Sequence, residues 1–348
     1  MTFQITVQPS GRSFATPPGD VILAAAIREG VGMPYGCKDG ACGSCKCKKV
    51  SGEVVHGPHQ SKALSADEEA AGWVLTCCAT PLSDVVLESR QVLEAGAHPI
   101  KKMPVRVSAL TLLSPDVMAM RLQLPASEPF LFHAGQYVEF LLRDGARRSY
   151  SMACAPHNQG STAHLELHVR HMPGGLFTDQ VFASLKVKDI LRIEGPYGSF
   201  MLREESDKPM VFLASGTGFA PIKALIEHLA FKAIQRPVTV YWGGRRPHDL
   251  YMHDWLVAKA TELPQLRYIP VVSDATTDDQ WTGRTGFVHH AVMADWPDLS
   301  GHQVYACGAP VVVESARRDF SAQCDLPPEE FFADAFTSAA DALTPTQT

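Results

Sequence analysis

Four cysteines in the first quarter of the chain have a spacing that suits metal chemistry. Cys37, Cys42 and Cys45 follow the pattern C-x4-C-x2-C, and Cys77 stands further along the chain. This is the spacing of plant-type [2Fe–2S] sites, in which four thiolates hold two irons. Many neighbouring residues are glycine, alanine or serine, and small residues let the backbone wrap a cluster and aim N–H donors at its sulfurs. The loop therefore predicts a [2Fe–2S] cluster.

A zinc site, unrelated free thiols and a disulfide framework fit the cysteines less well. A structural zinc site usually has two short Cys/His pairs, whereas this loop has one. Unrelated free thiols would rarely share this spacing and these small neighbours. A secreted disulfide framework would need an export signal, and residues 1–14 lack both the basic start and the apolar core of one. Cys47 is most simply a buried small residue on the strand that leaves the loop, and spacing alone leaves Cys77 and Cys78 as alternatives for the fourth ligand.

A second chemical motif lies on a predicted strand in the middle of the chain. The order Arg148-Ser149-Tyr150-Ser151 places the arginine and the tyrosine on one face and the two serines on the other. Alone, so short a motif is equally compatible with a surface strand. Its order along the chain gives it weight, because Gly174-Gly175 with Thr178 follows, and Gly195-Pro196-Tyr197-Gly198 comes next.

A third motif predicts a nucleotide phosphate site. Ser215-Gly216-Thr217-Gly218 follows an apolar run and continues into Phe219-Ala220-Pro221 and a helical pattern. Glycines let the backbone approach a pyrophosphate, and a helix N-terminus supplies N–H donors. Pro221 stands where a dinucleotide-binding fingerprint has its third glycine, and proline suits the first position of a helix. A later strand ends in Tyr305-Ala306-Cys307-Gly308-Ala309-Pro310, which could also be a plain turn with a buried thiol.

The elements that must position these motifs change character along the chain. Near the N-terminus we expect short strands, a helix over Val21–Glu29 capped by Asp20, and a capping box at Ser65-Ala66-Asp67-Glu68. From Pro104 to about Leu202 strand-like runs dominate, which predicts a small antiparallel barrel. From Lys208 onward, apolar and helical runs alternate, which is typical of a parallel α/β sheet.

These changes predict a multidomain protein. At 348 residues, the chain is long enough for two or three domains. The expected parts are a cysteine-loop domain at 1–92, a linker at 93–103, an antiparallel barrel at 104–203, an α/β domain at 208–338 and a flexible tail at 339–348.

Composition narrows the partners. The net charge of −6 and the absence of a Lys/Arg-rich run argue against nucleic-acid binding. No apolar stretch approaches the ~18 residues of a membrane span. With no signal peptide, a cytoplasmic protein without membrane contact is the expectation.

Together, these motifs resemble the ferredoxin–NADP reductase superfamily over residues 1 to about 338. The similarity is to reductase components with an N-terminal plant-type [2Fe–2S] ferredoxin domain, which serve oxygenases, and to the reductase of CDP-6-deoxy-glucoseen formation. It implies a β-grasp ferredoxin domain, an FAD-binding antiparallel β-barrel and an NAD(P)-binding α/β domain. It also favours Cys77 over Cys78, because Leu75-x-Cys77 matches the family's form of the fourth ligand.

The resemblance implies roles for the flavin motif. The Arg148 fork pairs with the FAD pyrophosphate, which suits a planar permanent cation, and Tyr150 packs on the isoalloxazine. Ser151 lies near flavin N5, beside Ser149 on the same strand. The remaining implied FAD contacts are the strand beside the flavin rim, His168, Val169 and Arg170, and the second pyrophosphate site, Gly174, Gly175 and Thr178.

The resemblance also implies the hydride site. Gly216, Thr217, Gly218 and Pro221 bind the coenzyme pyrophosphate, and Cys307 with Gly308 lies near the transferred hydride. Phe336 is the candidate for the terminal aromatic residue that covers the flavin, so Ser151, Cys307 and Phe336 form the expected catalytic set. Arg245 is the candidate contact for the adenosine end of the coenzyme, where NADH is favoured and NADPH stays open.

The implied activity is electron transfer from NADH through FAD to the [2Fe–2S] cluster and on to a partner oxygenase. A dehydrase of deoxysugar synthesis is the alternative acceptor. A ferredoxin-like electron carrier with a degenerate flavin lobe is a further alternative, as is a zinc-stabilised scaffold.

Overall fold

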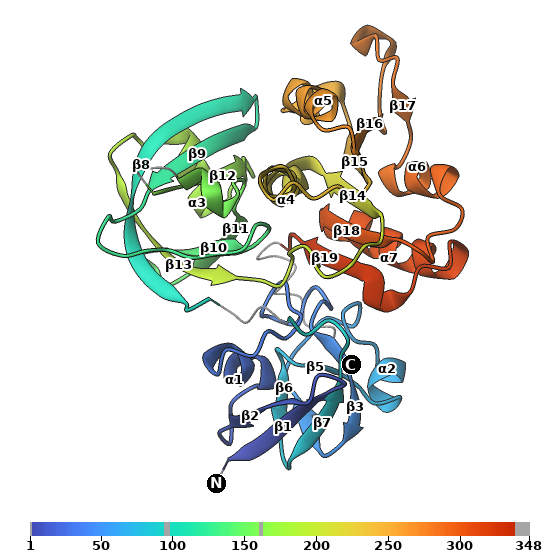
Figure 1. Cartoon of the computed structure of the whole chain (residues 1–348). Coiled ribbons are helices and arrows are strands. Elements are labelled where there is room, and N and C mark those ends of the chain that lie inside the picture. The colour runs from blue at the N-terminus through green and yellow to red at the C-terminus, as the bar shows by residue number, and fades with distance from the viewer. Residues whose placement is uncertain (1, 94–97, 160–162, 338–348) are drawn as a thin grey trace. The chain divides into compact units, whose positions relative to one another are not determined.

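The computed structural model describes residues 2–93, 98–159 and 163–337. The chain forms two compact units (Figure 1). Of the described residues, the N-terminal unit includes those up to Pro99, Gly198–Phe200 and those from Ala333 onward, and the C-terminal unit includes those within Ile100–Tyr197 and Met201–Phe332. None of the helices in the described ranges has the length and hydropathy that a membrane crossing requires. The predicted tail at 339–348 lies outside the described residues.

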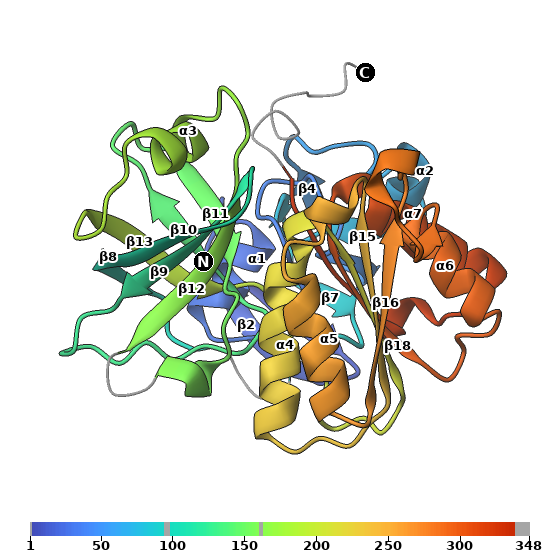
Figure 2. The ribbon, with the colours of Figure 1, turned by 90° about the horizontal axis from the view of Figure 1, so that it is seen from above.

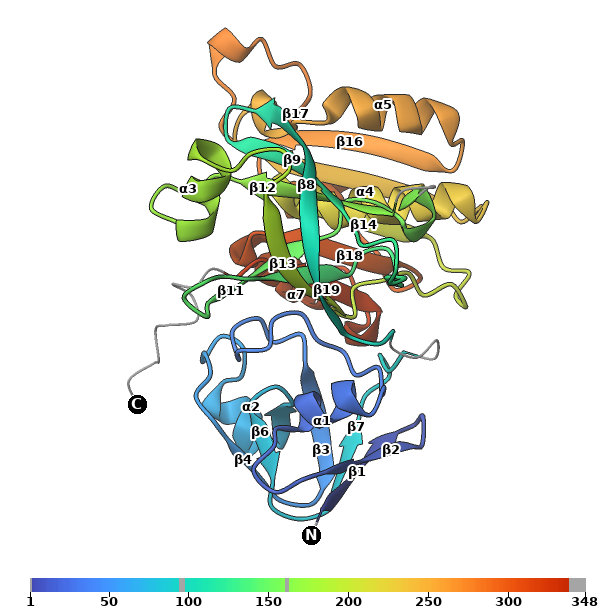
Figure 3. The ribbon, with the colours of Figure 1, turned by 90° about the vertical axis from the view of Figure 1, so that its left-hand side faces the viewer.

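The N-terminal unit is a five-stranded mixed sheet with a helix lying on it (Figure 3). The strand order is β2-β1-β7-β3-β5; β1 and β7 are parallel and the other neighbours antiparallel, while β4 and β6 form a separate pair. Ile5 and Val7 of β1 are fully buried, as alternation predicts. The elements are β1 (Phe3–Gln8), β2 (Arg12–Thr16), α1 (Ile22–Arg28), β3 (Lys46–Ser51), β4 (Val54–His56), α2 (Ala66–Ala70), β5 (Trp73–Leu75), β6 (Ala79–Pro81) and β7 (Val85–Glu88).

The two predicted helix starts of this unit have different outcomes. The capping box is confirmed, since Ser65 Oγ accepts the Glu68 N–H at 3.2 Å and the Glu68 carboxylate accepts the Ser65 N–H at 2.9 Å. The Asp20 cap is wrong: α1 begins after Val21, which makes no side-chain cap. Asp20 instead pairs with Arg28 at 2.9 Å.

The first lobe of the C-terminal unit is an antiparallel sheet in the order β11-β10-β13-β8-β9-β12. β8 is long and strongly curved (Figure 1), and irregularities in its register with β9 accompany the bend. One antiparallel bridge, Met152 with Leu167, links the exit of β11 to β12. The elements are β8 (Lys101–Ser114), β9 (Val117–Gln123), β10 (Tyr137–Leu141), β11 (Arg147–Ser151), η1 (Pro156–Gln159), β12 (His164–Arg170), α3 (Leu176–Ala183) and β13 (Ile190–Tyr197).

The limit between the two compact units falls inside the predicted linker at 93–103, after Pro99, and both ends of that segment make backbone contacts. Leu93 is buried and donates its N–H to Gly32 O, and residues 94–97 lie outside the described part of the chain. β8 begins at Lys101 because Met103 already faces the core in phase with Val105 and Val107.

Helix α3 was not predicted, since its eight residues give only a short pattern.

The second lobe of the C-terminal unit confirms the predicted parallel sheet. The order is β17-β16-β15-β14-β18-β19, with parallel pairing from β17 through β18. Helices α4 and α5 lie on one face, and α6 and α7 on the other (Figure 2). The elements are β14 (Met210–Ser215), η2 (Gly216–Gly218), α4 (Phe219–Phe231), β15 (Val238–Gly244), η3 (Pro247–Asp249), α5 (His253–Glu262), β16 (Leu266–Val272), η4 (Thr277–Asp279), β17 (Arg284–Thr285), α6 (Val288–Asp295), β18 (Gln303–Gly308), α7 (Pro310–Gln323), η5 (Pro328–Glu330) and β19 (Phe331–Ala335).

Helix α4 starts two residues earlier than the position of Pro221 suggested. It begins at Phe219, directly after η2, so Pro221 is its third residue rather than its first. The proline is still tolerated there, because the first four N–H groups of a helix have no intrahelical partner.

Candidate functional site

The cysteine loop occupies the connection between α1 and β3, and the fourth predicted ligand comes from the turn between β5 and β6. Cys37 and Cys42 are half-buried, whereas Cys45 and Cys77 are buried. β3 pairs with β5 from Lys46 to Leu75, which brings the end of the loop beside the turn that carries Cys77. The four thiols therefore come from two neighbouring connections, the α1–β3 loop and the β5–β6 turn.

Two glycines of the loop are required by its geometry. Gly40 has a φ of +75°, and a Cβ there would lie 2.7 Å from Cys78 Sγ and 2.9 Å from His59 Cβ. Gly43 has a φ of +73° and faces the Ala63 carbonyl. A side chain at Gly40 would be strained both by its backbone conformation and by its neighbours. The small residues of the motif are thus structural requirements of this loop.

The thiols approach one another in two pairs. Cys45 Sγ lies 3.3 Å from Cys77 Sγ, and the Cys42 sulfur accepts the backbone N–H groups of Cys37 at 3.4 Å and Ser44 at 3.5 Å. The hydrogen bond from the Cys37 thiol, aided by those from Ser44, lowers the pKa of Cys42. Four converging thiols with backbone donors aimed at one sulfur are a donor set that fits the predicted iron–sulfur cluster.

The neighbouring cysteines fit other roles. Cys78 Sγ is 3.6 Å from Cys77 Sγ and packs against Gly40. Cys77 is the one of the two that contacts Cys45, which favours it as the fourth ligand. Cys47 is buried on β3, as predicted, and burial raises the pKa of its thiol to about 12.

The flavin motif lies on β11, an edge strand of the antiparallel sheet. Tyr150 is half-buried, and its ring meets Phe140 edge-on at 5.7 Å and Phe177 at 5.4 Å. Burial raises the pKa of Tyr150, so its hydroxyl stays neutral. Arg148 is half-buried and donates to the carbonyl of Arg147 at 2.8 Å. Ser149 is exposed and Ser151 buried.

Strand β12 presents its three predicted contacts differently. The Val169 side chain is fully buried in the lobe's core, which leaves only its backbone to meet a cofactor. His168 is also buried, and its Nδ1 lies 3.0 Å from the Tyr251 hydroxyl. Arg170 is half-buried, with its guanidinium paired to Asp116 at 3.1 Å and to Asp249 at 3.3 Å.

The predicted second pyrophosphate site is the N-terminus of α3. Gly174 has a φ of +82°, and Gly175 precedes the first helical residue. Thr178 donates its hydroxyl to the Met172 carbonyl at 2.9 Å, which closes the loop over the helix start. Gly174 donates its N–H to Asp179 at 3.1 Å. A helix N-terminus of this kind favours an anionic phosphate group.

The loop at 215–218, termed the nicotinamide loop, is in backbone contact with the Cys307-Gly308 turn. A Cβ at Gly218 would lie 2.2 Å from the Cys307 carbonyl oxygen. Gly308, at a φ of +124°, would place a Cβ 2.4 Å from the Ser215 carbonyl oxygen. Such closeness is open only to glycine. Two motifs predicted separately therefore form one surface at the carboxyl ends of β14 and β18.

Contacts from the rest of the lobe fix this loop. Trp242 donates its indole N–H to Gly216 O at 3.0 Å and stacks on Phe219 at 3.9 Å. Gly216 and Thr217 are half-exposed, whereas Gly218, Pro221 and the Cys307 side chain are buried. Gly216 and Thr217 are therefore the part of the loop that a phosphate group can reach.

The two arginines after β15 differ in their surroundings. Arg246 pairs with Asp279 at 2.8 Å and with the Thr276 hydroxyl at 3.0 Å. Arg245 is exposed, and its backbone N–H donates to Asp249 at 2.8 Å.

Three family models match successive parts of the chain. Residues 5–82 match the 2Fe-2S iron-sulfur cluster binding domain, residues 104–202 the oxidoreductase FAD-binding domain and residues 212–318 the oxidoreductase NAD-binding domain. The chain is 40% identical over 339 residues to the CDP-6-deoxy-L-threo-D-glycero-4-hexulose-3-dehydrase reductase of Yersinia pestis, covering 97% of this chain and 99% of that protein.

Two further relatives come from oxygenase systems. Reductase component 2 of the terephthalate 1,2-dioxygenase of a Comamonas species is 36% identical, covering 97% of this chain and 98% of the relative. The crystal structure of an Amycolatopsis cytochrome P450 reductase, GcoB, superposes with a TM-score of 0.77 at 35% identity, covering 97% and 100%.

The chain belongs to the iron–sulfur flavoprotein reductases. The resemblance inferred from its motifs is confirmed, and so are the cofactor types: a [2Fe–2S] cluster, FAD and a nicotinamide coenzyme. The reductase is an electron-transfer oxidoreductase with one family domain for each cofactor.

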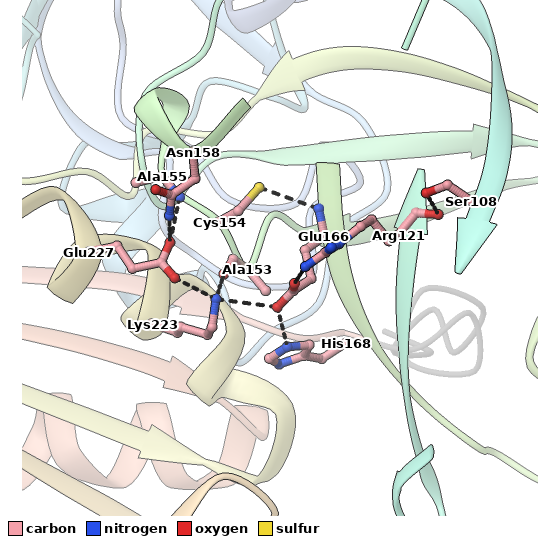
Figure 4. Close-up of polar contacts among 10 residues, drawn as sticks. All are labelled: Ser108, Arg121, Ala153, Cys154, Ala155, Asn158, Glu166, His168, Lys223 and Glu227. Atoms are coloured by element: carbon pink, nitrogen blue, oxygen red, sulfur yellow. Dashed lines mark hydrogen bonds and ion pairs between the residues drawn. The ribbon is translucent and has the colours of Figure 1, made fainter. Parts of the chain in front are cut away.

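Sequence reasoning missed one set of residues in the reductase. Lys223 and Glu227 of the second lobe make polar contacts with Ala153, Asn158 and Glu166 of the first lobe (Figure 4). Within the first lobe, the Cys154 sulfur accepts the Glu166 N–H. A signal existed in the sequence. Lys223 and Glu227 stand four residues apart in the otherwise largely apolar helix α4, where charged residues are rarely buried without partners.

The remaining predicted residue is Phe336. It is half-exposed and follows β19, whose Phe331 and Phe332 are buried as the sequence pattern suggested. Its role over the flavin stays a prediction.

Proposed function

We propose that this reductase takes electrons from NADH and delivers them singly to a separate oxygenase component. Bound FAD supplies the conversion of a hydride into single electrons, and the cluster supplies one-electron carriage. The chain contributes position and polarity, because a hydride must pass between two rings held in close, aligned contact.

Each predicted site residue has a place in this proposal. Arg148 and the α3 N-terminus, with Gly174, Gly175 and Thr178, hold the flavin pyrophosphate. Tyr150 packs against the flavin ring, Ser151 lies near its reactive edge, and Ser149 and the strand from His168 to Arg170 line its rim. The coenzyme lies on Gly216, Thr217, Gly218 and Pro221, with its reactive ring beside Cys307 and Gly308. Phe336 covers the flavin. The irons are held by Cys37, Cys42, Cys45 and Cys77.

One observation carries the proposal for the hydride site. Arg170 of the flavin sheet reaches the nicotinamide loop, so a Cβ at Gly216 would lie 2.9 Å from Arg170 Nη1. The strand assigned to the flavin rim and the loop assigned to the coenzyme pyrophosphate are therefore neighbours. That adjacency is what direct hydride transfer requires.

The fold and the domain limits are part of the same proposal. A helix on a mixed sheet supports a β-grasp ferredoxin domain at 1–92, and the bridge between Met152 and Leu167 supports closure of the antiparallel sheet into a barrel at 104–203. The parallel sheet supports an NAD domain at 208–338. Use of NADH, a coenzyme of the cell interior, supports a cytoplasmic location.

NADH is the proposed coenzyme. The Arg246 guanidinium is engaged by Asp279, and that carboxylate would repel a 2′-phosphate. The exposed Arg245 remains as a contact for the adenosine end of either coenzyme. With Arg246 engaged, one arginine fewer is available to bind a 2′-phosphate.

A dehydrase of deoxysugar synthesis is the second candidate acceptor. It is favoured by the 40% identity to the Yersinia reductase that serves such a dehydrase. An electron carrier without reductase activity is disfavoured, because both nucleotide-site motifs are complete and meet in the structure. Comparing the rates at which the reductase reduces a purified ring-hydroxylating oxygenase and a purified dehydrase would separate the two acceptors.

Replacing Cys42 tests the order of electron carriers. Cys42→Ser should abolish NADH-driven reduction of one-electron protein acceptors while reduction of ferricyanide, which the flavin can perform, persists. Cys47→Ala is the matched control, since it removes a buried thiol of the same segment that is outside the proposed ligand set, and it should leave both activities in place. Equal loss of both activities in the Cys42 variant would contradict the proposed order.

A further inference from the structure

A buried lysine links the two lobes of the C-terminal unit (Figure 4). Lys223 of α4 is only 5% exposed. Its Nζ donates to the Ala153 carbonyl at 2.8 Å and to Glu227 at 2.6 Å, and lies 3.2 Å from Glu166 of β12. All the donor capacity of this ammonium group is thus used within the protein.

Glu227 extends the link. One of its carboxylate oxygens accepts Lys223, and the other accepts the Ala155 N–H at 2.9 Å and the Asn158 side-chain amide at 2.7 Å. Two side chains one turn apart on α4 therefore hold both a carbonyl and an N–H of the segment that leaves β11.

Glu166 continues the chain of contacts toward the second lobe of the C-terminal unit. It lies 3.3 Å from His168 Nε2, while His168 Nδ1 meets the Tyr251 hydroxyl at 3.0 Å. Burial lowers the pKa of His168 despite the Glu166 carboxylate. A neutral ring suits the two contacts, with Nε2–H donating to Glu166 and Nδ1 accepting from Tyr251.

The places where this network attaches are those that matter for hydride transfer. Ala153 follows the flavin motif, two residues after Ser151, and α4 is the helix that opens at the nicotinamide loop. Since α4 begins directly after Gly218, a shift of this helix against β11 would move the loop relative to the flavin strand.

Stability alone does not account for such a network. Burying an ion pair costs desolvation that its attraction often fails to offset, and apolar residues of similar size can pack as well. Charged groups with directional hydrogen-bond partners differ from apolar side chains in one respect. They fix a single register of the two elements in contact, whereas apolar side chains can pack in several. The contacts found here fix the register of α4 on the exit of β11.

We propose that Lys223 and Glu227 are positioning residues that set the approach of the nicotinamide to the flavin by locking α4 to residues 153–158. The inference rests on the proposed placement of the flavin at Arg148–Ser151 and of the coenzyme at Gly216–Gly218. Neither residue touches the reacting atoms, and both act through the elements they join.

Glu227→Gln is the sharpest test, because the variant keeps the shape of the side chain and loses its charge. In the FAD-loaded protein, we expect anaerobic flavin reduction by NADH to slow about tenfold. Binding of NAD⁺, measured from the flavin spectrum, should change by less than about twofold. The isotope effect with 4-deuterated NADH should change, because the ring-to-ring geometry has changed, and amide exchange at residues 153–158 should accelerate.

The matched control is Lys259→Met. Lys259 lies over the same Trp255 ring as Lys223, at 5.9 Å against 5.5 Å, but pairs with Glu262 at the surface of α5. Its removal should leave flavin reduction, isotope effect and amide exchange unchanged. Equal slowing in this control would overturn the inference, since the effect would then be general to charge removal.

A second variant covers the case in which Glu227→Gln does not fold. Lys223→Met with Glu166→Gln removes both members of one ion pair, so that neither is left charged without the other. It should show the same slowing and faster exchange. Normal reduction, isotope effect and exchange in a folded variant would overturn the inference.

Failure of the underlying function has a separate signature. Arg148→Ala should weaken FAD binding about tenfold. If it retains FAD fully, the flavin placement fails; if it loses FAD while Glu227→Gln behaves as wild type, only the positioning role fails.

Discussion

The cysteine loop and the nicotinamide loop both depend on glycine, but the contacts that require glycine differ in how far apart the contacting residues lie in the sequence. Gly40 and Gly43 face residues of the same small unit, His59, Ala63 and Cys78. Gly218 faces Cys307, and Ser215 accepts the Ala309 N–H across 94 positions of the chain. The first loop is formed by nearby sequence, whereas the second exists only after the parallel sheet has aligned β14 and β18.

This comparison teaches where each site is vulnerable. The cysteine loop contains most of the proposed cluster ligands and its small residues in one short segment, so changes there should affect the cluster alone. The geometry of the nicotinamide loop depends on contacts with the end of β18, which is distant in sequence, and on α4, which is hydrogen-bonded to the first lobe. Changes there should affect hydride transfer while the cluster stays intact.

The largest effect is expected for Gly218→Ala. Its Cβ would lie 2.2 Å from the Cys307 carbonyl, which is backbone and cannot move aside cheaply. Overpacking strain of about 3 kcal/mol placed on the hydride geometry would slow NADH-driven flavin reduction about 100-fold. Stopped-flow absorbance measures this rate, and chemical reduction of the cluster by dithionite should stay normal.

Gly301→Ala is the control for that variant, because a Cβ there meets nothing within 4 Å. A Gly218 variant that also lost its cluster would contradict the comparison, because a change at the nicotinamide loop would then damage the cysteine loop as well.

Gly40→Ala should produce the next largest effect, confined to the cluster. The left-handed φ of +75° and the contact with Cys78 Sγ together cost about 2 kcal/mol, which would accelerate cluster loss up to about 30-fold. Bleaching of the visible iron–sulfur bands follows this loss, and NADH–ferricyanide activity should persist.

Gly30→Ala separates strain from collision. Gly30 has a φ of +71° but open space around its Cβ position. Cluster loss as fast in this variant as in Gly40→Ala would show that backbone strain, rather than the crowded loop, governs cluster retention.

The smallest effect belongs to the capping box beside the loop. Burial acts to raise the pKa of Glu68, but hydrogen bonds from Lys46 and Ser65 outweigh it and the pKa lies below its ordinary value. The side chain is 39% exposed, so after solvent screening Glu68→Gln should cost only about 0.5 kcal/mol.

The pH dependence of this variant has a defined sign. Because the folded pKa is depressed, the stability from Glu68 is present above its unfolded pKa of about 4.3 and is lost as pH falls through the folded value. The difference between wild type and Glu68→Gln in urea unfolding should therefore shrink from neutral pH to about pH 3. Asp67→Asn is the control on the same helix, and a gap that stayed constant with pH would contradict the assignment.

Several local features could be predicted from the sequence, and the local predictions that were wrong have local causes. The capping box of Ser65 and the buried face of β1 followed from patterns of a few residues. Asp20 failed as a cap because α1 begins one residue later than predicted, with Val21 at the N-cap position, and the Asp20 carboxylate pairs with Arg28. The start of β8 at Lys101, inside the predicted linker, did not follow from the pattern because two lysines precede the alternation that begins at Met103.

The buried network could not be predicted in the same way. Lys223 and Glu227 are compatible with a solvated helix face when only α4 is considered. Their partners, Ala153, Glu166 and Asn158, belong to another lobe, and no periodicity connects the two segments.

The sequence by itself determined the three cofactor types and the order of their motifs, because cysteine spacing and glycine-rich turns are chemical requirements met within short stretches of chain. Only the tertiary structure decided that Gly218 meets Cys307, that Arg170 reaches Gly216 and that Lys223 is buried. The physical reason is that burial and close backbone approach depend on partners far along the chain, which folding brings together and local preference does not specify.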